Sequence, residues 1–192
     1  MIKNTLSRLR MFVMLMLFFT VITSAHAQSL NPNWNQDLNN ALKEFLACEG
    51  TSQERTECVH FIGESLNTVY KINDFSKSGK YMSTSEIADF VKSNAKWKVL
   101  GPSYDQTTLS KAQESANAKK AVVAVFKNAE GVGHVVLVTP GELQLSGSWG
   151  LKVPNSASFF QKEPAKSYVN KGLSFAFARV MMKDITLYVR EY

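Results

Sequence analysis

The chain has 192 residues, of which 45% are hydrophobic and 20% are charged. This composition excludes a disordered or low-complexity protein, and the length fits one domain with an ordinary core. Two cysteines are too few for a disulfide-framed miniprotein or for a four-thiolate zinc site.

The first 27 residues have the pattern of an export signal. Basic residues open this segment, an uncharged apolar run follows at residues 11–22, and an Ala-x-Ala sequence ends at Ala27. The pattern predicts cleavage between Ala27 and Gln28. The apolar run is short for a membrane span, which needs about 20 residues. We therefore expect an exported protein, periplasmic or secreted, with no membrane contact after cleavage.

The predicted mature chain carries little net charge. The whole chain has a formal charge of +6, from 22 basic and 16 acidic residues. Three of the basic residues lie in the predicted leader: Lys3, Arg8 and Arg10. Their removal leaves 19 basic against 16 acidic residues, or +3. No cluster of Lys and Arg and no aromatic-basic stripe accompanies this charge, so we do not expect nucleic acid as a partner.

The first half of the predicted mature chain has the periodicity of helices. Apolar residues recur at every third or fourth position, and we expect helices over about residues 34–49, 56–69, 83–91 and 108–118. Ser83 and Glu86 have the spacing of a capping box, which predicts where the third helix begins.

The second half has the composition of strands. Short runs of β-branched and aromatic residues predict strands at residues 121–127, 134–139, 143–146, 175–181 and 185–190. The loop at residues 128–133 would join the first two as a hairpin. Helices followed by strands indicate an α+β fold, with helices packed on an antiparallel sheet. We expect one such domain over residues 28–192.

Two residues in this map have the placement of a catalytic pair. Cys58 falls near the start of the second predicted helix, where free N–H groups and a partial positive charge stabilise a thiolate. His134 opens the second core strand directly after Gly133. A thiolate activated by an imidazole is a nucleophile, and a third polar group would orient the ring. The following segments offer three such groups: Ser146, Ser148 and Asn155.

The same cysteine has a second interpretation. Cys48 ends one predicted helix and Cys58 begins the next, so a disulfide can form across the turn, and the composition of an exported chain favours it. His60 follows two residues later on another face of the helix, and we interpret it as a surface or packing residue. The chain lacks paired ligand spacing such as Cys-x-x-Cys, so we expect no metal site and no cofactor.

Four segments resemble one superfamily of enzymes. The segment CVHFIGESLN at residues 58–67 is similar to the helix start that holds the nucleophile in papain-like cell-wall peptidases and amidases of the NlpC and CHAP families. The segment at residues 121–142 resembles their central hairpin, in which Gly-His begins a strand. The segments VPNSASFF and KGLSFAF, at residues 153–160 and 171–177, resemble the stretch that carries their polar third residue.

The resemblance implies a papain-like fold and a role for each of these residues. Cys58 would be the nucleophile, His134 the general base and Asn155 the orienting residue, with Ser146 or Ser148 as alternatives for the last role. The implied substrate is a peptide or amide bond of peptidoglycan. Two loop aromatics are candidates for lining the substrate groove: Tyr104 and Trp149.

The sequence thus leaves two functions open. The first is an exported cysteine hydrolase, either a stem-peptide endopeptidase or an amidase, that acts on peptidoglycan. The second is a non-catalytic exported binding or inhibitory module on the same scaffold, in which Cys48 and Cys58 form a structural disulfide. The state of the Cys58 thiol distinguishes the two.

Overall fold

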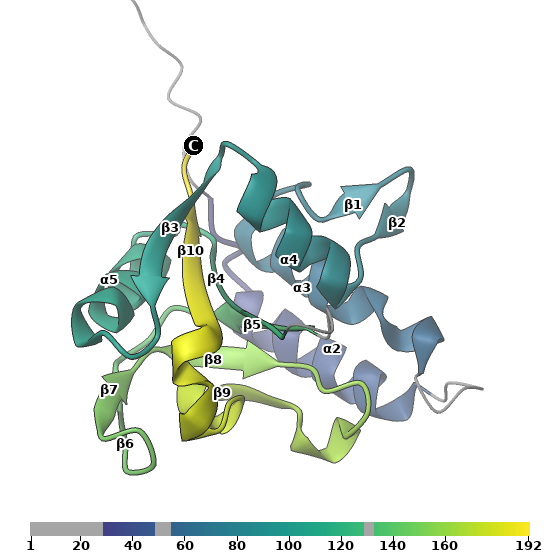
Figure 1. Ribbon diagram of the computed structural model, residues 1–192. Coiled ribbons are helices and arrows are strands. Elements are labelled where there is room, and N and C mark those ends of the chain that lie inside the picture. Colours follow the sequence, from purple (N-terminus) through teal and green to yellow (C-terminus); the bar gives the residue numbers. More distant parts are fainter. Residues whose placement is uncertain (1–28, 49–54, 129–132) are drawn as a thin grey trace, which may run out of the picture.

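A six-stranded antiparallel sheet forms the centre of the structure (Figure 1). The computed structural model describes residues 29–48, 55–128 and 133–192. In spatial order, the strands are β3 (Trp97–Pro102), β10 (Ile185–Arg190), β4 (Val122–Lys127), β5 (Gly133–Val138), β8 (Asn155–Ser158) and β9 (Tyr168–Gly172). The C-terminal strand β10 therefore pairs between two strands from the middle of the chain.

Helices cover both faces of this sheet. Three pack on one face: α2 (Trp34–Ala47), α3 (His60–Tyr70) and α4 (Thr84–Ser93). The helix α5 (Gln106–Asn117) packs on the other face, away from these three (Figure 1). The connections contain short 3-10 turns: η1 (Thr56–Cys58), η2 (Pro164–Lys166), η3 (Leu173–Phe175) and η4 (Arg179–Asp184).

Two small hairpins lie outside the central sheet. The first pairs β1 (Ser76–Lys77) with β2 (Lys80–Tyr81) beside α3. The second pairs β6 (Gln144–Ser146) with β7 (Leu151–Val153), and β7 packs against α5.

The alternation of side chains along β4 and β5 divides the interior into two cores. Residues 123, 125, 135 and 137 belong to the core under α2, α3 and α4. Residues 122, 124, 136 and 138 belong to the core under α5. Successive strand residues point to opposite faces, so both faces of these strands are apolar and buried. Each buried Val or Leu side chain contributes about 1.5–3 kcal/mol to folding.

Local sequence sets the start of α4. Ser83 Oγ accepts a hydrogen bond from the Glu86 N–H, and the Glu86 carboxylate accepts one from the Ser83 N–H at 2.8 Å. The Ser83 N–H and the Ser83 hydroxyl both donate to the Glu86 carboxylate, at 2.8 and 2.7 Å, and these two hydrogen bonds lower the pKa of Glu86. Ile87 and Val91 then point into the first core. The predicted capping box is confirmed.

The α+β class expected from the sequence is confirmed, and several elements differ from the expectation. The segment predicted as a strand at residues 175–181 instead lies across the turns η3 and η4. The helix expected from Thr56 begins at His60, after the 3-10 turn η1. The sequence interpretation missed three strands of the central sheet: β3, β8 and β9.

Within residues 29–48, 55–128 and 133–192, no helix is long and apolar enough to span a membrane. The predicted leader at residues 1–27 lies outside the described residues.

Candidate functional site

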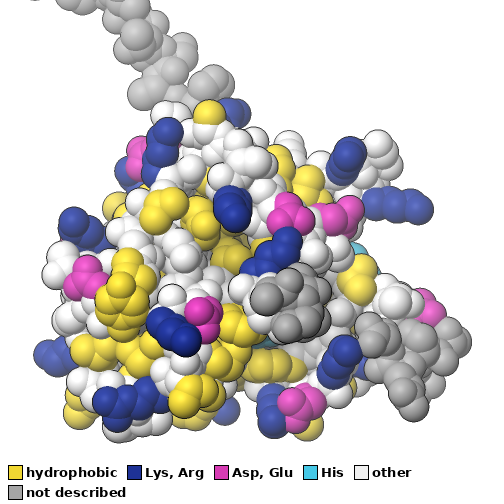
Figure 2. Space-filling model, viewed as in Figure 1, with side chains coloured by type: hydrophobic (Ala, Val, Ile, Leu, Met, Phe, Trp, Pro, Cys, Tyr) yellow, Lys and Arg dark blue, Asp and Glu magenta, His cyan; other side chains and the backbone are white. Residues whose placement is uncertain are grey.

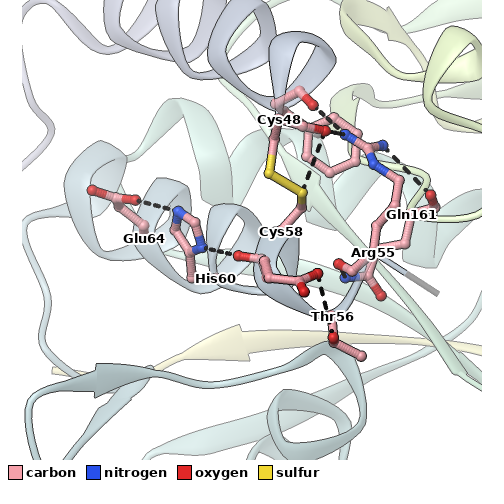
Figure 3. The surroundings of a disulfide bond; sticks show 9 residues. Cys48, Arg55, Thr56, Cys58, His60, Glu64 and Gln161 are labelled. Carbon is pink, nitrogen blue, oxygen red and sulfur yellow. Dashed lines mark hydrogen bonds and ion pairs between the residues drawn. A yellow bond between two sulfur atoms is a disulfide. The ribbon is translucent and has the colours of Figure 1, made fainter. Parts of the chain in front are cut away.

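Cys58 is bonded to Cys48. The two Cα atoms are 6.2 Å apart, and the disulfide joins the end of α2 to η1, just before α3 (Figure 3). Cys58 is 1% exposed and packs in the first core. Neither cysteine of the chain has a free thiol in this structure. The structure therefore contains the bridge that the sequence left as an alternative.

Arg55 connects the disulfide to a distant segment of the chain. Its Nη2 donates to the carbonyl oxygens of Phe45 at 2.5 Å and Cys48 at 2.7 Å, at the end of α2. Its guanidinium also lies 4.5 Å from the centre of the Phe45 ring. Gln161 Nε2 donates to the Arg55 carbonyl oxygen at 3.3 Å, and Arg55 Nη1 reaches the Gln161 carbonyl oxygen at 3.5 Å (Figure 3). The bridged turn is thus fixed to the segment around Gln161.

His134 lies on the other face of the sheet from Cys58. It pairs with Phe126 across β4 and β5, and it shares its strand face with Val136 and Val138 of the second core. Its ring stacks on Phe160 with centroids 4.5 Å apart. Among the described residues, no hydrogen bond, ion pair or ring contact joins His134 to Cys58. The structure does not bring the expected nucleophile and base together.

A serine from the neighbouring strand holds the His134 ring. Nε2 of His134 lies 2.7 Å from Oγ of Ser158, on β8. Burial lowers the pKa of His134 from its ordinary value of 6.5 to about 4, because a charged imidazole is poorly solvated there. The ring is therefore neutral at physiological pH.

The second ring nitrogen of His134 is reachable. Nδ1 has no hydrogen-bond partner among the described residues. The fully buried side-chain polar atom that lacks a partner in these ranges is Ser65 Oγ, so Nδ1 keeps some exposure although most of the His134 ring is buried. His134 lines a cavity, and Nδ1 is free to donate to or accept from a group placed in it.

The cavity beside His134 has a volume of about 660 Å³. Its walls come from β4, β5, the segment after β8 and the turns η3 and η4. Five phenylalanines line it: Phe126, Phe159, Phe160, Phe175 and Phe177. Small-molecule sites have volumes of about 300–1,000 Å³ and mostly apolar walls with few polar groups. The cavity has the size and lining of such a site.

Charged side chains surround the aromatic walls. Lys162, Glu163, Lys166 and Arg179 line the same cavity, and Glu163 is ion-paired with Lys166. Figure 2 shows hydrophobic side chains gathered over the lower part of the face in view, with Lys and Arg side chains among them. Basic residues outnumber acidic ones at the cavity.

Asn155 has a structural position rather than a place beside His134. It begins β8 and is buried, and its Nδ2 donates to Thr139 Oγ1 at 2.8 Å and to the Pro140 carbonyl at 3.1 Å. Its Oδ1 accepts from Gln144 Nε2 at 2.9 Å. Its hydrogen bonds tie β8 to the loop after β5 and to β6. The group that orients His134 is Ser158, three residues further along the strand.

The other predicted site residues lie apart from His134 or are packed. Trp149 is buried in the second core, and its Nε1 donates to the Phe177 carbonyl oxygen at 3.1 Å. Tyr104 is 58% exposed and does not line the His134 cavity. Ser146 and Ser148 bond to each other at 3.2 Å, and Ser148 alone of the two lines the cavity. The core encloses Trp149, and it does not line the His134 cavity.

His60 lies on the surface of α3, as the sequence interpretation expected. It stacks on Phe61 and lies 3.8 Å from the Glu64 carboxylate (Figure 3). In the part of the chain that the structure describes, no group of three or more His, Cys, Asp or Glu side chains is placed to hold a metal ion.

The sequence interpretation missed Ser158, Phe160 and Phe177 as site residues. All three lie in segments that carried the family resemblance. The available signal was the serine at every second position, Ser156 and Ser158, since alternate residues of a strand point to the same face.

No protein-family model matches the chain, and no curated protein matches it significantly. Any function assigned to it therefore rests on its own residues.

Proposed function

We propose that this chain is an exported, non-catalytic binding module that takes an apolar group of its ligand into the His134 cavity. The observation that carries this proposal is the cavity itself, with five phenylalanines and one neutral imidazole on its walls. Apolar walls provide affinity, and the reachable Nδ1 of His134 provides one directional hydrogen bond. The Cys48–Cys58 disulfide would stabilise the helical layer behind the sheet.

The surroundings of His134 favour binding over catalysis. Nucleophilic catalysis needs a nucleophile within hydrogen-bond reach of its base. The sulfur of Cys58 is in a disulfide in the opposite core. Ser158, which does contact the imidazole, is fully buried and does not line the cavity. A substrate in the cavity would therefore meet the histidine without a paired nucleophile.

We also propose a papain-like scaffold for the fold. Cys58 lies two residues before the start of α3, and His134 is the second residue of β5 in the antiparallel sheet, which is the order that the sequence resemblance implies. The β4–β5 pairing supports the predicted central hairpin.

A neutral fluorescent probe tests the binding proposal. N-phenylnaphthylamine is apolar and aromatic, and we expect saturable binding to the full chain with a Kd in the micromolar range. Ala178 lines the cavity and is exposed, so Ala178→Trp places an indole at its mouth. We expect this variant to bind at least about tenfold more weakly, which corresponds to about 1.4 kcal/mol.

The matched control is Ala118→Trp, at the exposed end of α5 and away from the cavity. It should bind the probe as the unmodified chain does. The proposal fails if the probe does not bind saturably, or if Ala178→Trp binds it as tightly as Ala118→Trp.

A second candidate is the cysteine hydrolase acting on peptidoglycan. It is favoured by the neutral imidazole with a reachable nitrogen, which is the form a general base needs. This function requires reduction of the disulfide and a rearrangement that brings the Cys58 sulfur to the face of His134. The enzyme would then be silent when oxidised.

Two single variants separate this candidate from the first. Cys48→Ala releases the Cys58 thiol, whereas Cys58→Ala removes it. Digestion of peptidoglycan by Cys48→Ala but not by Cys58→Ala would establish the hydrolase. Absence of digestion by both variants and by the reduced chain would exclude Cys58 as a nucleophile toward this substrate.

A further inference from the structure

We infer that the ligand of the His134 cavity is an aromatic or aliphatic anion, with its apolar part against the phenylalanines and its negative charge at the basic edge. This inference rests on the proposed binding function and adds the chemical class of the ligand. Two separate features of the cavity carry it: the composition of its walls and the sign of the charge at its edge.

The walls select an apolar group with a flat face. Phe160 stacks on His134 with an angle of 22° between the rings, and Phe177 meets His134 edge-on, with centroids 5.6 Å apart. Phe126 and Phe177 are also in contact, with centroids 6.3 Å apart. A ring or chain that enters here can replace water on several aromatic faces at once, which is the main source of affinity in such pockets.

The edge selects a negative charge. Of the charged residues that line the cavity, three are basic and one is acidic. The acidic one, Glu163, is neutralised by its ion pair with Lys166. Arg179 begins η4, and its exposed side chain has no hydrogen bond or ion pair among the described residues. Its planar guanidinium can therefore bind a carboxylate, sulfonate or phosphate oxygen pair.

A further lysine makes the same side positive. Lys171 on β9 lies with its Nζ 5.2 Å from the centre of the Phe175 ring, and Phe175 lines the cavity. This places a second positive charge beside a phenylalanine of the cavity wall. An anion at the edge would be attracted by Arg179 and Lys171 together, and this attraction weakens as salt is added.

Two dyes that differ by one charged group test the inference. Anilinonaphthalene sulfonate has the two aromatic parts of N-phenylnaphthylamine and one added sulfonate. We expect the sulfonate to bind the full chain about tenfold more tightly than the neutral dye, or about 1.4 kcal/mol. Arg179→Gln should reduce this preference to about twofold, since it removes the guanidinium and its positive charge and leaves a shorter, neutral polar side chain. Raising the salt concentration should also reduce the difference in affinity between the two dyes.

The matched control for Arg179→Gln is Lys98→Gln, on β3 and outside the cavity lining, which should leave the preference intact. The Ala178→Trp variant should bind both dyes more weakly than the unmodified chain, as expected if both dyes occupy this cavity. If the neutral dye binds and the sulfonate binds equally or less tightly, the inference is wrong and the proposed binding function stands. If neither dye binds saturably, both are wrong.

Discussion

The side chains of Cys58 and His134 lie on opposite faces of the six-stranded sheet. Cys58 packs with α2 and α3 in one core, and His134 shares the face of Phe126, Val136 and Val138. The strand pairing fixes this separation, because β4 and β5 pair without a register shift from residue 133 to residue 138. The cysteine therefore stabilises the helical layer, and the histidine belongs to the cavity on the far side.

The disulfide should contribute much of the stability of the fold. A bridge between residues ten positions apart restricts the unfolded chain and typically contributes about 2–4 kcal/mol. We expect a reductant to lower the free energy of unfolding of the unmodified chain by this amount in urea denaturation. The double variant Cys48→Ala/Cys58→Ala should unfold at the same urea concentration as the reduced chain, and a reductant should not change that concentration. An unchanged midpoint after reduction, with two thiols confirmed by mass, would show that the bridge is not stabilising.

His134 should make the fold sensitive to acid. Its pKa is about 4 in the folded state, below its ordinary value of 6.5, so the unfolded chain binds a proton that the folded chain does not. The stabilisation is therefore complete above pH 6.5 and is lost as the pH falls toward 4. Between pH 7 and pH 4.5 we expect a loss of up to about 2 kcal/mol from this residue.

Urea denaturation of His134→Gln at the same two pH values measures this contribution. The variant cannot titrate at this position, so it should lose less stability on acidification than the unmodified chain. His60→Gln is the matched control: it removes a histidine that does not line the His134 cavity, and it should retain the pH dependence that His134 contributes. Equal pH dependence in all three proteins would contradict the buried, neutral state of His134.

Ser158→Ala should remove the hydrogen bond that holds the His134 ring in position. The hydroxyl is the partner of Nε2 in a buried site, and an unpaired buried polar group costs about 1–3 kcal/mol. We expect a loss of stability of this size, together with weaker binding of N-phenylnaphthylamine. Ser174→Ala, on the cavity wall without a contact to His134, should change both quantities little. The same effect from both variants would show that the Ser158 hydrogen bond does not position the ring.

Asn155→Ala should affect stability and leave binding intact. The side chain makes hydrogen bonds to Thr139, Pro140, Gln144 and Asn170. Their loss should destabilise the fold by about 2–3 kcal/mol, because several partners become unpaired together. Under conditions in which the variant is folded, its Kd for N-phenylnaphthylamine should match that of the unmodified chain. Loss of binding from a folded variant would instead give Asn155 a place in the site.

The elements that could be predicted from the sequence are those with local causes. The capping box at Ser83 and Glu86 involves neighbouring residues, and the prediction of α4 is therefore correct. The β-branched runs at β4, β5 and β10 are buried on both faces, so their composition alone identifies them. The segment at residues 175–181 is also rich in apolar residues, yet it forms 3-10 turns. Its backbone-to-backbone hydrogen bonds include local ones, from the Ala176 N–H to the Leu173 carbonyl oxygen and from the Met181 N–H to the Ala178 carbonyl oxygen.

The arrangement of the site depends on contacts that sequence periodicity does not contain. Alternation places His134 with Val136 and Val138, but it does not say which face of the sheet receives α3 and Cys58. That choice depends on how the chain crosses from the helices to β3 and β4. The orienting role of Ser158 depends on the pairing of β5 with β8. The sequence therefore placed Cys58 near the start of a helix and His134 in a strand. It did not predict that the sheet separates the two side chains.

The measurement that tests the central claim most directly is a nuclear magnetic resonance titration of the histidine rings with N-phenylnaphthylamine. The signals of His134, assigned with the variant His134→Gln, should shift progressively and saturate together with the dye fluorescence. The signals of His60, on the surface of α3, should stay in place. Saturation of the dye with no change in the ring signals of His134 would contradict the assignment of this cavity as the binding site.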